Sequence, residues 1–457
     1  MVSYLVLAAL MRTIAATVTV NDPSDTILPK DWAADDALLA DYNIPFISAQ
    51  PRDIEAAYKF TKGSKFVSHN TYSVDKNDTS VILVSDGAHL TASYVNILKE
   101  GYSTNLNEAS FWGFNAAVNV ANTSTATLEH VNITVHNGAA NIYSYGTDTV
   151  VKVNNAWLYS SGPVSHALYG SGNGTIIGRN IRHFSGGTRS SAFSGDSPAG
   201  YIHVYDSVSH CAGIGSATYY ALGEIYAENV ISHSDKGPVV FMDGKQNATL
   251  VNCDATAGLL GGVAIFSSSV RQSSAQLNFK DSKITTLGDT MPGLWFGNTI
   301  IDVAIDNTQF NLSSGVLVSA NYSQITQEFN HYAGYEENSS LQPAEVKVKV
   351  KESALKGDLV AYNGSYISWS LGSYSSWTGT AYSGYKEASF DIALDKTSNW
   401  TLTKTTTVQN FTDADKTLSN VFSNGHSLYY NSSATKSRWL KGQTIKLAGG
   451  GVAKPYF

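Results

Sequence analysis

Cysteine, charge and long apolar runs are all scarce in this sequence. Two cysteines occur among 457 residues, so at most one disulfide can form. No apolar run reaches about 18 residues, which argues against a membrane-spanning helix. The formal charge is −7 and no long basic run is present, which argues against a nucleic-acid partner. Charged residues make up only 15% of the chain, whereas 38 glycines and 26 tyrosines accompany many serines and threonines. This composition suits strands joined by tight turns and argues against a helical bundle.

Short segments of one shape recur between residues 126 and 310: a polar pair, then alternating apolar positions, then Ser, Gly or His. When the second residue of each polar pair is taken as a pivot, the spacings are 25, 25, 27, 22, 24, 29 and 25 residues. A near-constant period indicates a repeat architecture, and apolar residues at period two indicate strands. We therefore predict an all-β fold, a single-stranded parallel β-solenoid of about 13–15 coils with one coil per period. The pivots are His130, Asn155, Asn180, Ser207, Asn229, Cys253, Ser282 and Asn307.

The two ends of the chain differ from this repeat. Residues 1–16 have the apolar stretch and small residues of a secretory signal peptide, so we expect a secreted protein. Residues 22–78 have helical spacing in DWAADDALLADYN and PRDIEAAYKF, which predicts a helical N-terminal cap. The β-helix is predicted over 79–457, with loop insertions near 99–125 and 325–345.

Sequons for N-glycosylation are frequent, which agrees with secretion. The twelve candidate sites are Asn77, Asn122, Asn132, Asn173, Asn247, Asn311, Asn321, Asn338, Asn363, Asn399, Asn410 and Asn431.

Two pairs of residues test the coil spacing. Cys211 and Cys253 are 42 residues apart, nearly two coils. Aligned positions two coils apart lie about 10 Å from each other, beyond the roughly 7 Å that a disulfide allows, so buried free thiols are favoured over a disulfide. Trp377 and Trp400 are 23 residues apart, one coil, and would stack either as packing between coils or as a platform for a sugar.

An asparagine stands at the turn of several coils, at Asn155, Asn180, Asn229 and Asn307, and Ile or Val stands beyond it after Asn180 and Asn229. This column resembles the asparagine ladder of the right-handed parallel β-helices in the pectin-lyase-like superfamily, over most of residues 79–450. The resemblance implies a secreted protein that cleaves, epimerises or binds acidic polysaccharides in a groove along the strands. Motifs of single subfamilies are missing, since the only Asp-Asp pair is Asp35–Asp36 and G-H-G and W-x-D-H do not occur. No catalytic set can therefore be transferred.

A first candidate site is the column just before the pivots. It places Asp206 and Glu228 on adjacent coils with Arg179 beside Asp206. Two carboxyl groups at that spacing could serve as the acid and the nucleophile of a retaining glycosidase. The alternative is a solvated ladder of charges beside a turn.

A second candidate site consists of histidines. His183 and His210 each lie three residues after a pivot and should stack. Either could act as the base of a polysaccharide lyase, with Arg179 or Arg182 binding the substrate carboxylate. Strict alternation would instead turn both imidazoles into the core. We predict no metal site, because a third ligand is not evident, and calcium has no supporting motif.

A third candidate is a set of aromatic and imidazole side chains that could bind substrate: Tyr201, Tyr205, Tyr219, Tyr220 and His233. The leading hypothesis is a secreted, monomeric carbohydrate-active enzyme, a polysaccharide lyase or glycoside hydrolase, without an evident cofactor. One alternative is a non-enzymatic glycan-binding surface protein. The other is an isomerase or cyclase that takes an apolar small molecule under a lid formed by one of the insertions.

Overall fold

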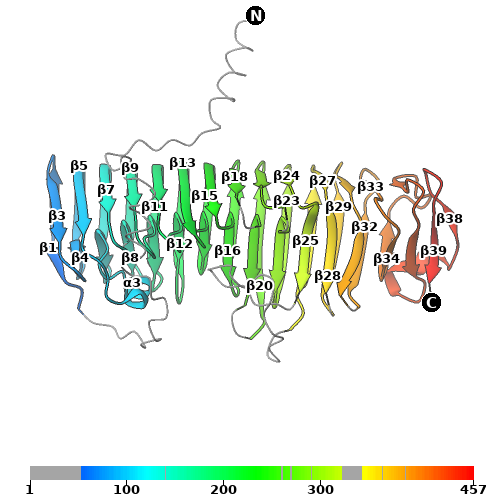
Figure 1. The fold of residues 1–457 in the computed structure, drawn as a ribbon, viewed down its shortest axis with the longest axis horizontal. Helices are drawn as coiled ribbons and strands as arrows, with labels where there is room; N and C mark the ends of the chain where they lie inside the picture. Colours follow the sequence, from blue (N-terminus) through cyan, green and yellow to red (C-terminus); the bar gives the residue numbers. More distant parts are fainter. Residues whose placement is uncertain are drawn as a thin grey trace, which may run out of the picture.

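The protein folds as a right-handed parallel β-solenoid of about 15 turns, as its sequence predicted (Figure 1). The structure is a computed structural model that describes residues 53–456, apart from 139, 259–260, 268–269, 290, 322–341, 363 and 386. The predicted signal peptide, residues 22–52 of the predicted cap and nearly all of the second insertion lie outside the described residues. No helix among the described residues is long and apolar enough to cross a membrane.

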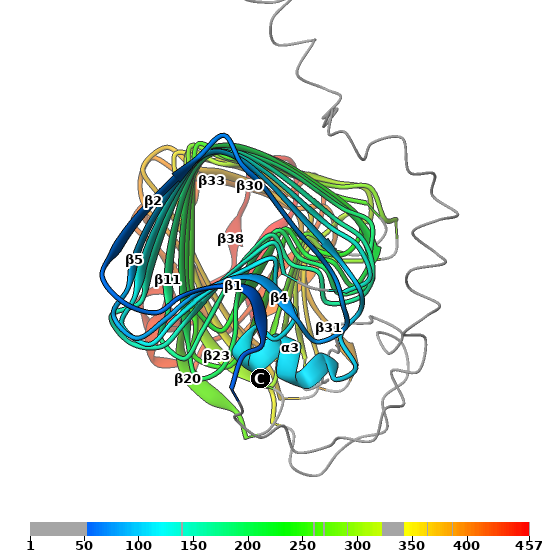
Figure 2. The ribbon, with the colours of Figure 1, turned by 90° about the vertical axis from the view of Figure 1, so that its left-hand side faces the viewer.

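Each coil has three walls (Figure 2). Wall 1 is a sheet of thirteen parallel short strands. They are β1 (Ala56–Phe60), β4 (Ser80–Val84), β6 (Val118–Ala121), β8 (Ile142–Tyr145), β10 (Leu168–Ser171), β12 (Phe193–Gly195), β14 (Tyr219–Ala221), β16 (Val240–Asp243), β19 (Val263–Phe266), β22 (Leu294–Gly297), β25 (Val316–Asn321), β28 (Asp358–Tyr362) and β31 (Ala381–Tyr385).

In each coil, wall 1 is followed by a stretch of chain that contains one bend. Wall 2 is the part before this bend, and wall 3 is the part after it. The two walls belong to one long strand in several coils of the N-terminal half and to two strands in most other coils. The strands are β2 (Ser64–Ser68), β3 (Thr71–Asp75), β5 (His89–Glu100), β7 (Thr125–Val135), β9 (Val150–Ser160), β11 (Thr175–Ser185), β13 (Gly200–Ile214), β15 (Gly223–Lys236), β17 (Asn247–Val251), β18 (Asp254–Ala257), β20 (Gln272–Lys280), β21 (Lys283–Thr286), β23 (Thr299–Asp306), β24 (Gln309–Leu312), β26 (Glu345–Lys351), β27 (Ala354–Lys356), β29 (Tyr366–Gly372), β30 (Ser376–Thr378), β32 (Ser389–Leu394), β33 (Asn399–Thr401), β35 (Asn410–Asp413) and β36 (Val421–Phe422). The C-terminal coils add β34 (Thr406–Val408), β37 (Leu428–Asn431), the 3-10 helix η1 (Thr435–Leu440), β38 (Ile445–Lys446) and β39 (Val452–Tyr456).

One residue with positive φ makes the bend between walls 2 and 3 in each coil from that of β2 and β3 to that of β26 and β27. The four predicted ladder asparagines have this conformation, with φ between 44° and 57°. Asparagine tolerates it better than most residues, and amide-to-amide hydrogen bonds link successive coils. For example, Asn180 Nδ2 donates to Asn155 Oδ1 at 2.5 Å, and Asn252 Nδ2 donates to Asn229 Oδ1 at 2.7 Å. The turn column is therefore an amide ladder.

Three predicted pivots are wrong by one residue. The bend residues in those coils are Asp206, Asn252 and Asp281, each the first member of its polar pair, with φ of 52°, 50° and 51°. The residues that follow them, the predicted pivots, are buried. The Ser207 hydroxyl, for instance, accepts a hydrogen bond from the Ile181 N–H at 3.0 Å. Asp and Asn adopt positive φ more readily than Ser or Cys, and this preference decides which member bends the chain.

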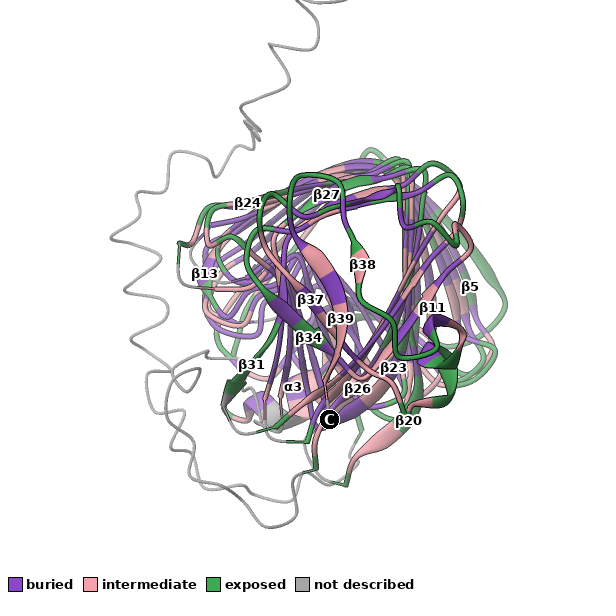
Figure 3. Ribbon diagram, turned by 90° about the vertical axis from the view of Figure 1, so that its right-hand side faces the viewer, coloured by how far each residue is buried: buried purple, intermediate pink, exposed green. Residues whose placement is uncertain are grey.

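Inward side chains form the core along the axis of the solenoid (Figure 3). Cys211 and Cys253 are both buried free thiols, as predicted. Trp377 and Trp400 stack at 4.8 Å with 12° between their planes, and both are fully buried. This pair is packing between coils and not a sugar platform.

The described part of the predicted N-terminal cap is not helical. Residues 56–75 form β1, β2 and β3, which pair in parallel with β4 and β5 as the first coil of the solenoid. The helical spacing of PRDIEAAYKF is overridden there by pairing with the next coil. At the other end β38 runs antiparallel to β39, which breaks the parallel pattern at that edge.

The first insertion contains α3 (Leu106–Trp112), which lies outside the coil on wall 1 (Figure 2). Tyr143 on β8 is fully buried, and its hydroxyl donates to the Ser110 carbonyl at 2.5 Å. The space beneath this insertion is thus filled by the protein's own side chains.

Candidate functional site

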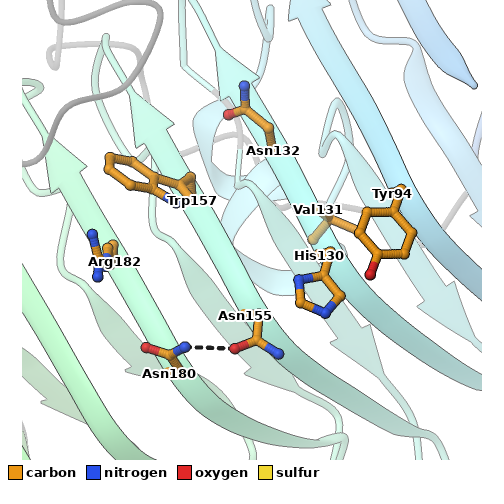
Figure 4. A pocket seen from close by; sticks show the side chains of 8 residues that line it. All are labelled: Tyr94, His130, Val131, Asn132, Asn155, Trp157, Asn180 and Arg182. Atoms are coloured by element: carbon orange, nitrogen blue, oxygen red, sulfur yellow. Dashed lines mark hydrogen bonds between the residues drawn. The ribbon is translucent and has the colours of Figure 1, made fainter. Parts of the chain in front are cut away.

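A groove runs along the solenoid axis on the outer surface of β5, β7, β9 and β11 (Figure 4). Two columns of side chains form its sides. The bend column supplies the first side, and the outward column two residues further along each strand supplies the second, because side chains on one face alternate. The hollow has a volume of about 430 Å³. Its lining residues are Tyr94, His130, Val131, Asn132, Asn155, Trp157, Asn180 and Arg182.

Aromatic rings and amides dominate this groove. The Tyr94 and His130 rings stack at 4.6 Å and 3°, and Tyr94 is 53% exposed. The register pairs Asn132 with Trp157 and Trp157 with Arg182, so these three side chains form one column. The Arg182 guanidinium lies over the Trp157 ring, 5.1 Å from its centre. A flat aromatic surface beside amides and a cation can bind sugar rings and a carboxylate.

Arg182 has no carboxylate partner among the residues that the structure describes. Its neighbour Arg179, in contrast, forms an ion pair with Asp206 at 3.1 Å and lies over the Tyr205 ring at 4.5 Å. The sequence pattern suggested either arginine as a carboxylate clamp. In the structure Arg182 lies in the groove, whereas Arg179 already contacts Asp206 in the bend column and Tyr205 on wall 2.

A second cluster lies on wall 3 near the end of the groove. His210 on β13 and His233 on β15 are register partners, and both donate from Nε2 to Asp235 Oδ1, at 3.0 and 2.8 Å. The bond from His210, followed by that from His233, holds the pKa of the Asp235 carboxyl well below its usual range. The Phe184 ring meets the His210 ring edge-on at 5.2 Å and links the cluster to the strand of Arg182.

The predicted pair of carboxyl groups does not form. Glu228 is the register partner of Tyr205, and its carboxylate accepts a hydrogen bond from Tyr226 at 2.9 Å. Asp206 belongs to the bend column, where it accepts from Asn229 at 2.9 Å. The prediction that Asp206 and Glu228 share a column is wrong because the pivot was misplaced by one residue in that coil.

The predicted stack of His183 on His210 is also wrong. His183 pairs with Ser209, and His210 pairs with Phe184, so the two imidazoles lie on opposite faces of the sheet. His183 is fully buried, and burial lowers its pKa to about 3. The inward orientation predicted by alternation holds for His183 and fails for His210. A buried imidazole without solvent access cannot act as a base on a polysaccharide.

The predicted tyrosines do not form one surface. Tyr219 points into the core, where it stacks on Phe193 at 5.7 Å, whereas Tyr220 lies on the outer side of wall 1 and stacks on Phe241 at 5.5 Å. Tyr201 is 37% exposed on wall 2. Together with Tyr205 beneath Arg179, these residues occupy three separate environments. Of the predicted substrate-binding residues, only His233 lies on wall 3 near the end of the groove.

Wall 1 carries a buried acid that the sequence did not reveal. Asp196 accepts a hydrogen bond from the Tyr169 hydroxyl at 2.5 Å and another from the Ser197 N–H at 2.6 Å. Burial raises the pKa of Asp196 to about 6. The ring of His166 lies 4.2 Å from that of Tyr169, and burial lowers its pKa to about 3. This network is enclosed and lies on a different wall from the groove.

Several groove residues could have been found from the sequence. Trp157 and Arg182 each stand two residues after a correct pivot, so the column arithmetic already places them together. Asp235 stands two residues after His233 and therefore on the same face. His130 was itself a predicted pivot, whereas Tyr94 was hidden because the first insertion lengthens the coil between Tyr94 and His130.

The fold and the groove define a parallel β-solenoid with a ligand-sized hollow on its outer surface. No protein-family model, curated protein or solved structure matches the chain.

Proposed function

We propose that this protein binds an acidic polysaccharide in the groove of Figure 4, as a secreted member of the pectin-lyase-like superfamily. The observation that carries the proposal is Arg182, a guanidinium without a carboxylate partner in the described chain, stacked on Trp157 in a hollow that is lined with amides. Arginine binds carboxylates through two parallel hydrogen bonds, and a uronic acid presents that group on a sugar ring.

The direction of the groove supports a polymer over a single sugar. Equivalent side chains repeat at the coil spacing of about 4.8 Å along the axis. Amides at Asn155 and Asn180 and rings at Tyr94 and His130 continue the same column. An extended chain along the axis would meet such groups coil after coil, whereas a small ligand would use only a few of them.

The test is binding to polygalacturonate, to alginate and to a neutral glucan by isothermal titration calorimetry. Arg182→Gln should weaken binding of both polyuronates about 10-fold or more, because a charge-assisted hydrogen bond contributes roughly 1.5–3 kcal/mol. Arg179→Gln is the matched control, since Arg179 lies outside the groove, and it should leave the affinity unchanged. Equal affinity of wild type and Arg182→Gln for both polyuronates would reject the proposal.

Cleavage of the bound glycan is the second candidate function. It is favoured by His210, His233 and Asp235, which lie partly exposed beside the groove and are able to supply acid–base chemistry. Incubation with each polyuronate, followed by ultraviolet detection of unsaturated ends and by a reducing-end assay, separates lyase, hydrolase and simple binding.

A further inference from the structure

Two strands place three potential metal ligands together on the outer face of wall 3. His210 and His233 are partners in the parallel register of β13 and β15. Asp235 follows His233 by two residues, so its side chain leaves the same face of β15. The three side chains are partly exposed, at 24%, 32% and 38%. An ion from solvent can therefore reach them.

The donor atoms are already close to the separations that a bound ion requires. All three lie within 4.8 Å of one another. Ligand atoms about 2.0–2.2 Å from a divalent ion, at right or tetrahedral angles, lie about 2.8–3.6 Å apart. The two nitrogen-to-oxygen distances, 3.0 and 2.8 Å, fall within this range.

The donor atoms of these three side chains determine which kind of ion they can bind. Two imidazole nitrogens with one carboxylate oxygen suit first-row transition metals and Zn²⁺, whereas Ca²⁺ and Mg²⁺ prefer oxygen ligands alone. Within the described chain, Asp235 forms ion pairs only with the two histidines, and no lysine or arginine neutralises it. Phe184 packs edge-on against His210 and gives the site one apolar side.

We propose that His210, His233 and Asp235 form a binding site for one divalent transition-metal ion, with Zn²⁺ as the representative ion. Three protein ligands leave at least one coordination position open toward solvent, which is the arrangement of a site that binds water or a substrate oxygen. The inference is independent of glycan binding, because it stands on the three ligands alone.

The experiment uses the untagged full-length chain, stripped with a chelator and dialysed. Calorimetric titration with Zn²⁺ should give one site per chain, and substitution by Co²⁺ should give the visible absorption of a bound ion. Asp235→Asn and His233→Gln should each lower the affinity at least 10-fold, and Zn²⁺ should raise the melting temperature of wild type only.

His203→Gln is the matched control. His203 pairs with Glu224 at the same 3.0 Å distance on the same two strands, but no third ligand is grouped with that pair in the described residues. This variant should bind Zn²⁺ as wild type does. The proposal fails if wild type binds no Zn²⁺, if Asp235→Asn retains wild-type affinity, or if His203→Gln loses the site as well. Circular dichroism of each variant shows whether loss of binding reflects loss of the fold.

Discussion

His183 is a polar residue in the core of the solenoid. Neither ring nitrogen has a hydrogen-bond partner among the described residues, although the side chain is fully buried. Unpaired buried polar groups cost about 1–3 kcal/mol each. Leu158 occupies the same column one coil earlier, so leucine fits the strand. We expect His183→Leu to raise the free energy of unfolding at pH 7 by about 1–3 kcal/mol, measured by chemical denaturation.

The same substitution should change the response to acid. The unfolded chain protonates His183 near pH 6.5, but the folded chain does so only near pH 3. Between these values the free energy of unfolding should fall by about 1.4 kcal/mol per pH unit as pH decreases. His183→Leu should lack this slope. His183→Gln, polar but not titrating, should also lack it without gaining stability at pH 7. An unchanged slope in both variants would contradict the assignment.

Asp196 has the opposite pH dependence. Its pKa is raised from 3.8 to about 6, so between these values the folded chain holds a proton that the unfolded chain releases. Its stabilising contribution is complete below pH 3.8 and is lost as pH rises through 6. Asp196→Asn should therefore be more stable than wild type at pH 7, by up to about 3 kcal/mol, with no difference at pH 3.5. An asparagine amide can accept from the Ser197 N–H and donate to Tyr169. Denaturation curves at both pH values decide this.

At the scale of the strand, the bend residue fixes the direction of each wall. Asn180 combines a φ of 52° with a ladder hydrogen bond. Asn180→Ala loses both advantages, whereas Asn180→Gly keeps the conformation. The alanine variant should be the less stable of the two by about 1 kcal/mol. At the exposed Lys152 of β9 the order should reverse, since an ordinary strand position favours alanine. The same order at both positions would show that the bend does not set the stability.

The same bend explains what the sequence could predict. The period is visible in the sequence because every coil contains a similar number of residues. This period in turn predicts that the coils stack in parallel. The face on which a side chain lies depends on identifying the bend residue without error, since a shift of one residue reverses every side chain. At Asp206 that shift created a false pair with Glu228 and a false stack of His183 on His210. The coils pivoting on Asn155 and Asn180 were aligned correctly, and there Trp157 and Arg182 were predictable partners.

At the scale of the whole molecule, the core of the solenoid is built from contacts between neighbouring coils and not from contacts between coils far apart in the stack. Each coil packs mainly on its two neighbours, so stability should be a sum of local terms. The groove lies in the N-terminal half of the solenoid, and the His210, His233 and Asp235 cluster occupies the coils that follow it. Changes in the C-terminal coils should leave them intact.

Trp400→Ala tests this independence. Trp400 is fully buried, stacks on Trp377 and donates from Nε1 to the Gly379 carbonyl at 3.0 Å. Its truncation should cost about 3–5 kcal/mol through the cavity left behind. Because that loss is local, hydrogen exchange followed by mass spectrometry should accelerate in the coils from about residue 366 to 430 and stay unchanged over 125–214. Leu158→Ala, a cavity in the N-terminal half of the stack, should give the complementary map centred on 130–210. If either variant accelerated exchange evenly along the chain, the solenoid would unfold as one cooperative unit, and the groove would share the stability of its distant ends.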